Sequence, residues 1–304
     1  MISIIDPHIH YISLAKGQYG WLKSYNPPYW PNKKSVAINV NANNLTMKSP
    51  LFLSGVVHIE AGFDNDKPEN ELAFVQQDCM ANVDFDSKTV SYIDIQLAPK
   101  LFISRLNTLL RYHSVTGIRY ILDEQNVHVL KIDDVRHNLT ILAQHNLHFE
   151  LQANFNNAEI SRIIYDTFSS IPTLKTVINH AGFIPHELKS ANFKDWQVAM
   201  ENMASLTSTH LKFSGMEMSH PSYNEATFAQ LLARCIDNFS ESRVMVASNY
   251  PVMLLSDKFA DNLLADHYHA YWKMVTDIIS REQLPLDLLV NKNAAKFYRF
   301  SSVR

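Results

Sequence analysis

Short runs of β-branched and aromatic residues alternate along the chain with longer segments in which apolar residues recur every three to four positions. This alternation is typical of βαβ units that build a parallel sheet. The short runs predict eight strands, at residues 2–5, 51–60, 89–96, 115–122, 147–153, 174–180, 209–215 and 243–249. The longer segments predict helices at residues 69–82, 100–112, 133–144, 157–168, 195–206, 227–239 and 261–279. Eight strands with intervening helices in 304 residues predict an α/β fold, a single-domain TIM (β/α)8 barrel spanning residues 1–304.

The main rival fold is an open, doubly wound sheet, which binds nucleotides through a glycine-rich loop. The chain has only 7 glycines, and neither G-x-G-x-x-G nor G-x-x-x-x-G-K-[ST] occurs in it. The barrel is therefore the fold we expect.

Composition excludes several classes of protein. Apolar residues make up 46% of the chain and charged residues 19%, as in a globular protein with a sizeable core. The formal net charge is -3 and no long basic run occurs, so we expect a small-molecule substrate and no nucleic-acid partner. No stretch approaches the roughly 20 apolar residues needed to span a bilayer, so we expect no membrane partner.

The first residues and the cysteines bear on the compartment. No basic segment precedes the first apolar run, so we expect no signal peptide. The two cysteines, Cys79 and Cys235, fall in predicted helices and are expected to be buried thiols rather than a disulfide framework. A cytoplasmic location fits these features, and the sequence leaves a homodimer open.

The connection between the first two predicted strands, at about residues 11–50, is too long for an ordinary βα loop. It carries Tyr19, Trp21, Tyr25, Tyr29 and Trp30. At the C-terminal face of a barrel such a loop would cover the pocket as a lid. An aromatic cluster packed on the outside of the barrel is the alternative.

Two histidines follow the first apolar run, in Asp6-Pro7-His8-Ile9-His10. Side chains two apart on a strand point the same way, so His8 and His10 both project into the mouth of the predicted barrel. Imidazoles so placed can share a metal ion or bind one oxyanion. Two unrelated surface histidines are the competing interpretation, and the position at a strand end favours a site.

His180 and Asn249 end two later predicted strands, the sixth and the eighth. A single histidine at a strand end is more often structural than functional. His180 would be a third imidazole at the same rim, which favours a functional role.

Together these segments resemble the amidohydrolase superfamily, in particular its branch of lactone hydrolases similar to 2-pyrone-4,6-dicarboxylate hydrolase and fuconolactone hydrolase. That branch opens with an Asp-x-His-x-His strand and a Tyr-Gly-Trp-Leu-like segment, matched here by residues 6–10 and 19–22. The resemblance continues in order through Val57-His58-Ile59-Glu60-Ala61, Gly117-Ile118-Arg119-Tyr120, Asn179-His180-Ala181-Gly182, Lys212-Phe213-Ser214-Gly215 and Asn293-Ala294-Ala295-Lys296-Phe297-Tyr298. It therefore covers the whole chain.

The resemblance implies catalytic roles for His8, His10, His180 and Asn249. The paired histidines bind metal or substrate in the superfamily, and His180 matches the histidine at the reacting carbonyl. A metal, if present, would bind His8, His10 and His180, and zinc is the expected ion.

Candidate substrate-binding residues are Arg119, His58, Glu60, Gln152 and Trp21. Arg119 matches a position where the branch often has an arginine, which can hold a substrate carboxylate. An ion pair of Arg119 with Glu150 or Asp123 is the alternative. His58 and Glu60 share one face of the second predicted strand and could line the mouth. An ion pair of Glu60 with a neighbouring basic group is the alternative. Glu150 and Gln152 share a face of the fifth predicted strand, and the same two interpretations apply to them.

Asn249 departs from the family, which usually has an aspartate there to orient or deprotonate the attacking water. An amide cannot accept a proton at neutral pH and is a poorer metal ligand than a carboxylate. Either Glu60, Glu150 or a histidine serves as base, or Asn249 only positions water, or hydrolysis has been lost. The departure predicts no metal or a weakly bound divalent one.

The function we expect is hydrolysis of a lactone or related cyclic ester of a small, carboxylated molecule. The three histidines would stabilise the developing oxyanion, Asn249 would position water and Arg119 would hold the anionic part. A metal-dependent decarboxylase on the same barrel and a small-molecule binding protein are the alternatives.

Overall fold

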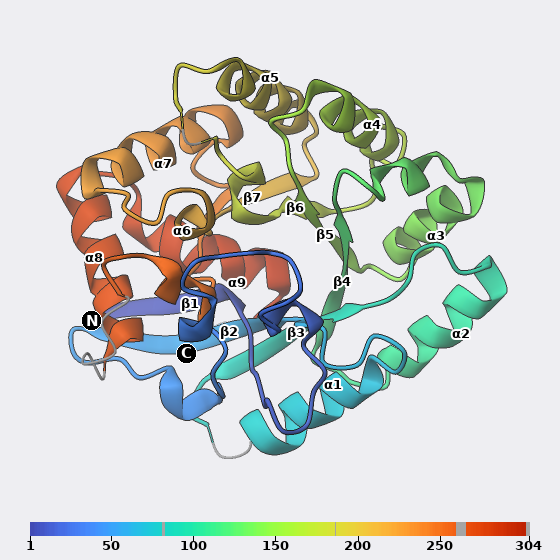
Figure 1. Cartoon of the computed structure of the whole chain (residues 1–304), viewed down its shortest axis with the longest axis horizontal. Coiled ribbons are helices and arrows are strands. Elements are labelled where there is room, and N and C mark those ends of the chain that lie inside the picture. The colour runs from blue at the N-terminus through green and yellow to red at the C-terminus, as the bar shows by residue number, and fades with distance from the viewer. Residues whose placement is uncertain (81–82, 186, 260–265, 302–304) are drawn as a thin grey trace.

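Eight parallel strands form one sheet in chain order in the computed structural model, which describes residues 1–80, 83–185, 187–259 and 266–301. Figure 1 shows these strands at the centre of the molecule, with the helices around them. The strands are β1 (Ile2–Ile9), β2 (Leu51–Ile59), β3 (Asp86–Tyr92), β4 (Val115–Leu122), β5 (His148–Ala153), β6 (Thr176–Ile178), β7 (Thr209–Phe213) and β8 (Val244–Val246). The fold is a single-domain TIM barrel, as the alternation of short and long apolar patterns predicts.

The helices connect successive strands around the outside of the barrel. They are α1 (Glu69–Phe74), α2 (Pro99–Leu109), α3 (Asp133–Gln144), α4 (Ala158–Ser169), α5 (Ala191–Ser205), α6 (Met216–Ser219), α7 (Glu225–Phe239), α8 (His267–Arg281) and α9 (Asn293–Tyr298). Side chains cap three of them at the N-terminus, namely Asn157, Ser190 and Asn224, and each accepts a bond from a backbone N–H of the first turn. Among the described residues, no helix has the length and apolar character needed to cross a bilayer.

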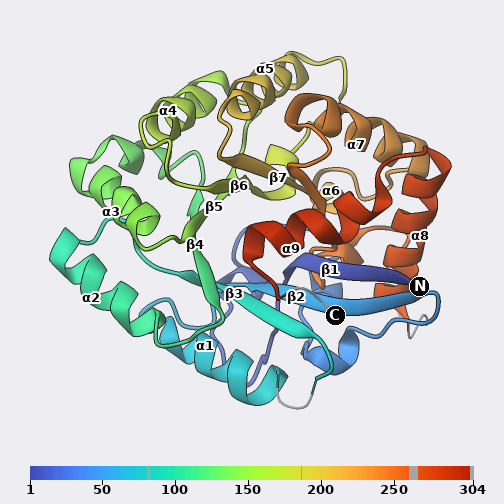
Figure 2. The same cartoon turned by 180° about the vertical axis from the view of Figure 1, so that it is seen from behind.

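The barrel encloses a small apolar core of its own, separate from the larger one between the sheet and the outer helices. Ile5, Val57, Val90, Val177 and Met245 point inward from five strands and pack with residues of α9. Figure 2 shows α9 lying across the strands on the side opposite to the view of Figure 1. This helix therefore closes one end of the barrel and leaves the other end to the site.

The sheet closes into a barrel where β1 meets the chain that follows β8. The backbone N–H of His10 donates to the carbonyl of Tyr250 at 2.8 Å, and that of Asn249 donates to the carbonyl of His8 at 3.0 Å. Beside them, the buried carboxylate of Asp6 accepts bonds from Ser248 and from the Tyr268 hydroxyl of α8. Burial raises the pKa of Asp6 to about 6, against the effect of these hydrogen bonds. We call this junction the β1–β8 seam.

A bulge in β1 decides which side chains face inward. The pairing with β2 shifts register between Asp6 and Ile9, so that Ile9 packs in the outer core although Ile5, four residues before it, lies in the inner core. The predicted strand at residues 2–5 is therefore longer in the structure and reaches Ile9.

The predicted elements correspond to observed ones, with differences at their ends. All eight predicted strands overlap an observed strand, and α3 has the predicted bounds. The predicted helix at residues 261–279 begins at His267 as α8, and residues 260–265 lie outside the described part of the chain. Neither α6 nor α9 was predicted, because each is too short to show a helical period. The cysteines are buried and free, as expected.

One glycine allows a buried histidine to fill the inside of the barrel. A Cβ at Gly117 would lie 2.3 Å from the Cε1 and Nε2 atoms of His148. The ring cannot move away easily, because it packs against Phe297 and Tyr298 and its Nε2 lies 3.1 Å from Glu150 Oε1.

We therefore expect Gly117→Ala to lower the free energy of unfolding by about 1–3 kcal/mol, the usual cost of overpacking a core. The measurement is the urea midpoint at constant m-value. Gly20→Ala is the matched control, because the one atom of the described residues within 4 Å of its Cβ would be Asn26 Nδ2, at 3.7 Å. Equal stability of the two variants would contradict the packing described here.

Candidate active site

Three imidazoles meet at the ends of β1 and β6. The ring centroids of His8 and His10 lie 5.0 Å apart, and those of His8 and His180 lie 4.6 Å apart. All three side chains are buried. His180 follows β6 with a φ of 53°, in the left-handed region that few residues other than glycine adopt. Such backbone conformations are often found at functional sites.

The hydrogen bonds of the ring Nδ1 atoms fix what the other nitrogens can do. His10 Nδ1 lies 2.8 Å from the carbonyl oxygen of Ile59, which only accepts, so Nδ1 carries the proton and Nε2 has a free lone pair. His8 Nδ1 lies 3.5 Å from the Lys212 ammonium, which only donates, so a neutral His8 carries its proton on Nε2. His10 thus offers an acceptor and His8 a donor.

A buried ion pair lies beneath His8 inside the barrel. Lys212 Nζ is 2.7 Å from Glu150 Oε2, and both side chains are fully buried. The Tyr298 hydroxyl of α9 donates to Glu150 Oε1 at 2.6 Å. Burial lowers the pKa of Lys212 to about 8, and Glu150 opposes this effect. Burial alone would raise the pKa of Glu150, but Lys212 and His148 together lower it to about 2.

Burial and nearby positive charge keep the three imidazoles neutral at pH 7. The pKa of His8 lies well below its usual value because of burial and then the charge of Lys212. For His10 and His180 the causes are burial and then the charge of Arg119. Each of these two cations is itself paired with a carboxylate, Lys212 with Glu150 and Arg119 with Glu60.

Arg119 bonds to Glu60 and Gln152, not to Glu150 or Asp123, the ion-pair partners considered in the sequence analysis. Its Nε donates to Glu60 Oε1 at 2.7 Å, its Nη1 donates to Gln152 Oε1 at 2.8 Å, and its Nη2 donates to the carbonyl of Glu60. The guanidinium has five N–H groups, so two remain after these bonds. Glu150 pairs with Lys212 instead of Arg119. Glu60 forms the alternative considered for it, an ion pair with a neighbouring basic group, which is Arg119.

Asn249 lies at the seam, beside His8. Its φ is 57°, which asparagine tolerates better than most residues. Its Nδ2 donates to Glu217 Oε1 at 2.9 Å, while its Oδ1 is buried and has no hydrogen-bond partner among the described residues.

Sequence reasoning missed Glu217, which lies in the four-residue helix α6 directly after Ser214 and Gly215. Burial raises the pKa of Glu217 to about 7, and the bond from Asn249 opposes this effect. One feature of the sequence could have identified this residue: Glu217 is a single carboxylate between two methionines just after a predicted strand, in Gly215-Met216-Glu217-Met218.

Polar atoms without partners gather at these strand ends. Besides Asn249 Oδ1, they are His8 Nε2 and both side-chain atoms of Asn179, all buried and without hydrogen-bond partners in the described part of the chain. Asn179 precedes His180, two residues after the inward-facing Val177. Buried polar atoms in native proteins are nearly always hydrogen-bonded, so this group fits a polar molecule held between the ends of β1, β6 and β8.

His58, one of the candidate substrate-binding residues, does not join this group. Val57 and Ile59 take the inward positions of β2, so His58 faces the outside of the barrel. The backbone N–H of Tyr11 donates to His58 Nδ1 at 3.1 Å, and His58 Nε2 lies 3.1 Å from Glu71 Oε1 of α1. Both ring nitrogens are therefore occupied away from the site.

The aromatic segment after β1 reaches the histidines. The Trp21 ring centroid is 6.2 Å from that of His10, and its indole N–H donates to the carbonyl of Ala61 at 2.7 Å. Trp30 packs edge-on against Trp21 at 6.2 Å, whereas Tyr25 and Tyr29 are exposed. Figure 1 shows this dark-blue segment on the near face of the barrel.

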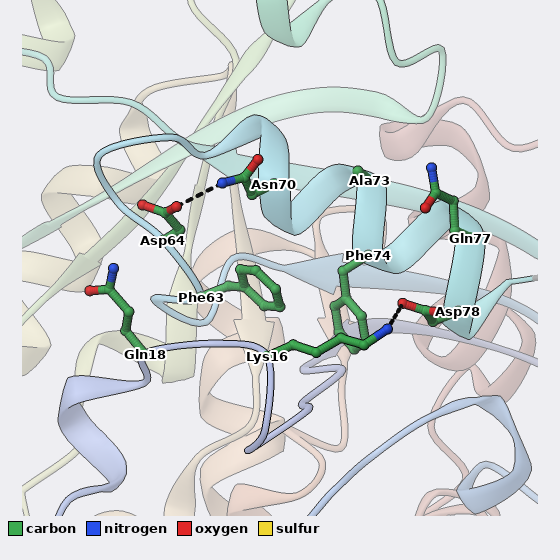
Figure 3. Close-up of a pocket in the computed structure, with 9 residues that line it drawn as sticks. All are labelled: Lys16, Gln18, Phe63, Asp64, Asn70, Ala73, Phe74, Gln77 and Asp78. Carbon is green, nitrogen blue, oxygen red and sulfur yellow. Dashed lines mark hydrogen bonds and ion pairs between the residues drawn. The ribbon is translucent and has the colours of Figure 1, made fainter.

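An open hollow lies elsewhere, between the segment after β1 and α1. Figure 3 shows its lining side chains, with Lys16 bonded to Asp78 and Asn70 to Asp64. Its volume is about 310 Å³, and it contains none of the expected site residues. It is therefore separate from the histidine cluster.

The donor set at the histidines does not fit a divalent cation. Among the described residues, no group of three or more His, Cys, Asp or Glu side chains is arranged to hold a metal. His8 Nδ1 faces an ammonium, whereas a metal-bound histidine usually donates its other N–H to an acceptor. Position 249 offers an amide in place of a carboxylate, so none of these ligands brings the negative charge that would offset a divalent cation.

Comparison with known proteins agrees with this fold. The chain is 26% identical to the uncharacterized protein y4mH of Sinorhizobium fredii (strain NBRC 101917 / NGR234), over 98% of this chain and 99% of that one. A Burkholderia multivorans amidohydrolase with bound zinc has a TM-score of 0.74 at 17% identity, covering 98% of this chain and 99% of that one.

Two further solved structures share the fold. A putative 2-pyrone-4,6-dicarboxylic acid hydrolase from Pseudomonas putida has a TM-score of 0.65 at 15% identity, and both chains are fully covered (100% each). A 2,6-dihydroxybenzoate decarboxylase from Rhizobium has a TM-score of 0.60 at 12% identity, covering 98% of this chain and 99% of that one. The family model described as Amidohydrolase matches residues 5–300, and the chain therefore belongs to the amidohydrolase family.

Proposed function

We propose that this amidohydrolase opens a lactone or related cyclic ester of a small molecule that carries a carboxylate. The observation that carries the proposal is that two rings with centroids 5.0 Å apart turn Nδ1 to opposite kinds of partner, His10 to the carbonyl of Ile59 and His8 to the ammonium of Lys212. These contacts assign an acceptor to His10 Nε2 and a donor to His8 Nε2. Ester hydrolysis needs both groups at one carbon, a donor for the developing oxyanion and an acceptor for the proton of water.

In the proposed reaction, Asn249 Oδ1 accepts a hydrogen bond from the attacking water. The water oxygen bonds to the lactone carbonyl carbon and its proton passes to His10 Nε2. The carbonyl oxygen becomes an oxyanion that accepts a hydrogen bond from His8 Nε2–H. The bond from carbon to the ring oxygen then breaks, and the imidazolium of His10 returns its proton to that oxygen. The product is an open hydroxy acid, and the histidine is neutral again.

The remaining hydrogen-bonding capacity of Arg119 supports a substrate that carries a carboxylate. Lys212 is paired with Glu150 and Arg119 with Glu60, but Arg119 keeps two N–H groups after its bonds to Glu60 and Gln152. A substrate carboxylate beside this guanidinium would gain charge-assisted hydrogen bonds. Trp21 would cover the bound molecule as part of a lid, as its position beside His10 suggests.

The decarboxylase alternative depends on a cation that the donor set does not fit, so we place it second. Binding without turnover is the remaining alternative, and a direct assay separates it from hydrolysis.

Replacing the acceptor tests the mechanism. His10→Asn keeps a donor for the Ile59 carbonyl and removes Nε2, so we expect kcat on the best lactone of a panel to fall about 10²–10⁴-fold with a smaller change in KM. Turnover is followed by proton release, and His113→Asn, at an exposed position, is the control. Retained turnover in His10→Asn would remove His10 from the mechanism, and ligand binding without turnover in the parent would favour a binding protein.

Metal removal makes a separate prediction. We expect purified protein to contain less than one equivalent of zinc, and exhaustive treatment with a chelator to leave kcat unchanged within about two-fold, because three neutral imidazoles and an amide lack the anionic ligand that would offset the charge of a divalent cation. Elemental analysis and lactone turnover before and after treatment are the measurements. A stoichiometric metal that resists the chelator would contradict the proposed mechanism.

A further inference from the structure

Glu217 is a buried carboxyl group that the proposed reaction does not use. It lies on α6 and is 3% exposed. In the described part of the chain, its one hydrogen bond to another side chain comes from Asn249 Nδ2, at 2.9 Å. Two other carboxylates near the site have cations, since Glu60 pairs with Arg119 and Glu150 with Lys212, whereas Asp6 accepts from the hydroxyls of Ser248 and Tyr268. Glu217 differs from all three because its side-chain partner is a neutral amide.

The groups around Glu217 are apolar or neutral. The 3-10 turn η7 (Val252–Leu255) packs against α6 with four buried apolar residues. Two tyrosines, Tyr223 and Tyr271, are the titratable groups that sense Glu217, whose charge adds to burial in raising their pKa values above the usual range. Both phenols therefore stay neutral between pH 5 and 9, so that Glu217 is the group that changes charge here.

An ionised carboxylate determines which way the Asn249 amide points. A carboxylate only accepts hydrogen bonds, so the amide must turn Nδ2 toward Glu217 and Oδ1 away from it. In this orientation Asn249 Oδ1 is buried and has no hydrogen-bond partner among the described residues. It lies next to His8, whose carbonyl accepts a hydrogen bond from the backbone N–H of Asn249. A protonated Glu217 can also donate, and the amide can then turn over and present Nδ2 instead.

We propose that Glu217 is a positioning residue that holds the Asn249 amide with Oδ1 toward the reacting water. The asparagine thereby orients water as a carboxylate oxygen would, without adding a negative charge next to the substrate. The catalytic consequence rests on the proposed hydrolysis, whereas the orientation of the amide is a property of the protein without substrate.

The sign of the pH dependence follows from the burial of Glu217, which places its pKa at about 7. Above this pH the carboxylate is ionised and Oδ1 faces the site. Below it the orientation is lost, so activity decreases as the pH falls. Two other groups titrate in the same range, since burial raises the pKa of Asp6, at the seam, to about 6 and lowers that of Lys212 to about 8. The imidazoles titrate at lower pH, because their pKa values lie well below 6.5. A transition that belongs to Glu217 is therefore identified by its loss in Glu217→Gln.

The orientation is tested without substrate, by NMR of protein labelled with ¹⁵N at asparagine. The side-chain NH₂ signal of Asn249 is assigned by its loss in Asn249→Asp and followed from pH 5.5 to 8.5. We expect a transition with a midpoint near 7 in the parent and none in Glu217→Gln. Glu201→Gln, at an exposed position of α5, is the control and should keep the transition. A parent signal that does not change with pH, or one that still titrates in Glu217→Gln, would overturn the proposal.

Lactone turnover gives the second arm. Glu217→Gln can donate or accept, so we expect kcat to fall about ten-fold with KM within about two-fold, and the acid limb near pH 7 to disappear. Asn249→Asp places two carboxyl groups at hydrogen-bond distance, so its acid limb should move to higher pH as the pair shares a proton. An unchanged kcat and pH profile in Glu217→Gln would overturn the catalytic role. If the parent turns over no lactone while the NMR transition is present, the proposed function fails and the orientation of Asn249 stands.

Discussion

The same hydrogen bonds at the β1–β8 seam close the barrel and bring the residues of the candidate site together. The backbone bond from Asn249 to His8 joins the last strand to the first, and the same two residues carry side chains that face the site. Asp6 reinforces the junction from the outer side through Ser248 and Tyr268. Any rearrangement that opens the seam would separate Asn249 from His8, so the relative position of these groups is as fixed as the barrel itself.

A second constraint is the buried pair of Lys212 and Glu150 beneath the histidines. Taking two charges out of water is costly, and the cost is offset only when the geometry and the additional hydrogen bonds are good. Here Tyr298 and His148 supply those bonds to Glu150. The pair is a poor choice for stability alone, but it places an ammonium against one nitrogen of His8 and so determines the proton on the other. Glu217 acts on the amide of Asn249 in the same way. In both pairs a buried charged group determines which atom of its neutral neighbour donates a hydrogen bond and which one accepts.

Much of this arrangement could be predicted from the sequence, because it depends on local patterns. The alternation of strands and helices predicts the barrel, and the spacing of His8 and His10 after an apolar run predicts their shared direction. Glu217 could not be found in this way, because α6 has only four residues and no period to reveal it. The position of His58 depends on which residues of β2 face inward, and its motif does not indicate this. The partners of Arg119 depend on the reach of its side chain from β4 past β3 to Glu60, which follows β2.

The bond between Tyr298 and Glu150 spans 148 positions of the chain, and the bond between Asn291 and Ser3 spans 288. Contacts of such long sequence separation form late and slowly, because the intervening chain must first be ordered. The group beneath His8 therefore forms only when the chain from β5 to α9 is ordered. Partial openings that release α9 would withdraw a donor from Glu150 while leaving most strands paired. Amide exchange in α9 would accordingly report on the integrity of the ion pair, at a distance from the face where substrate binds.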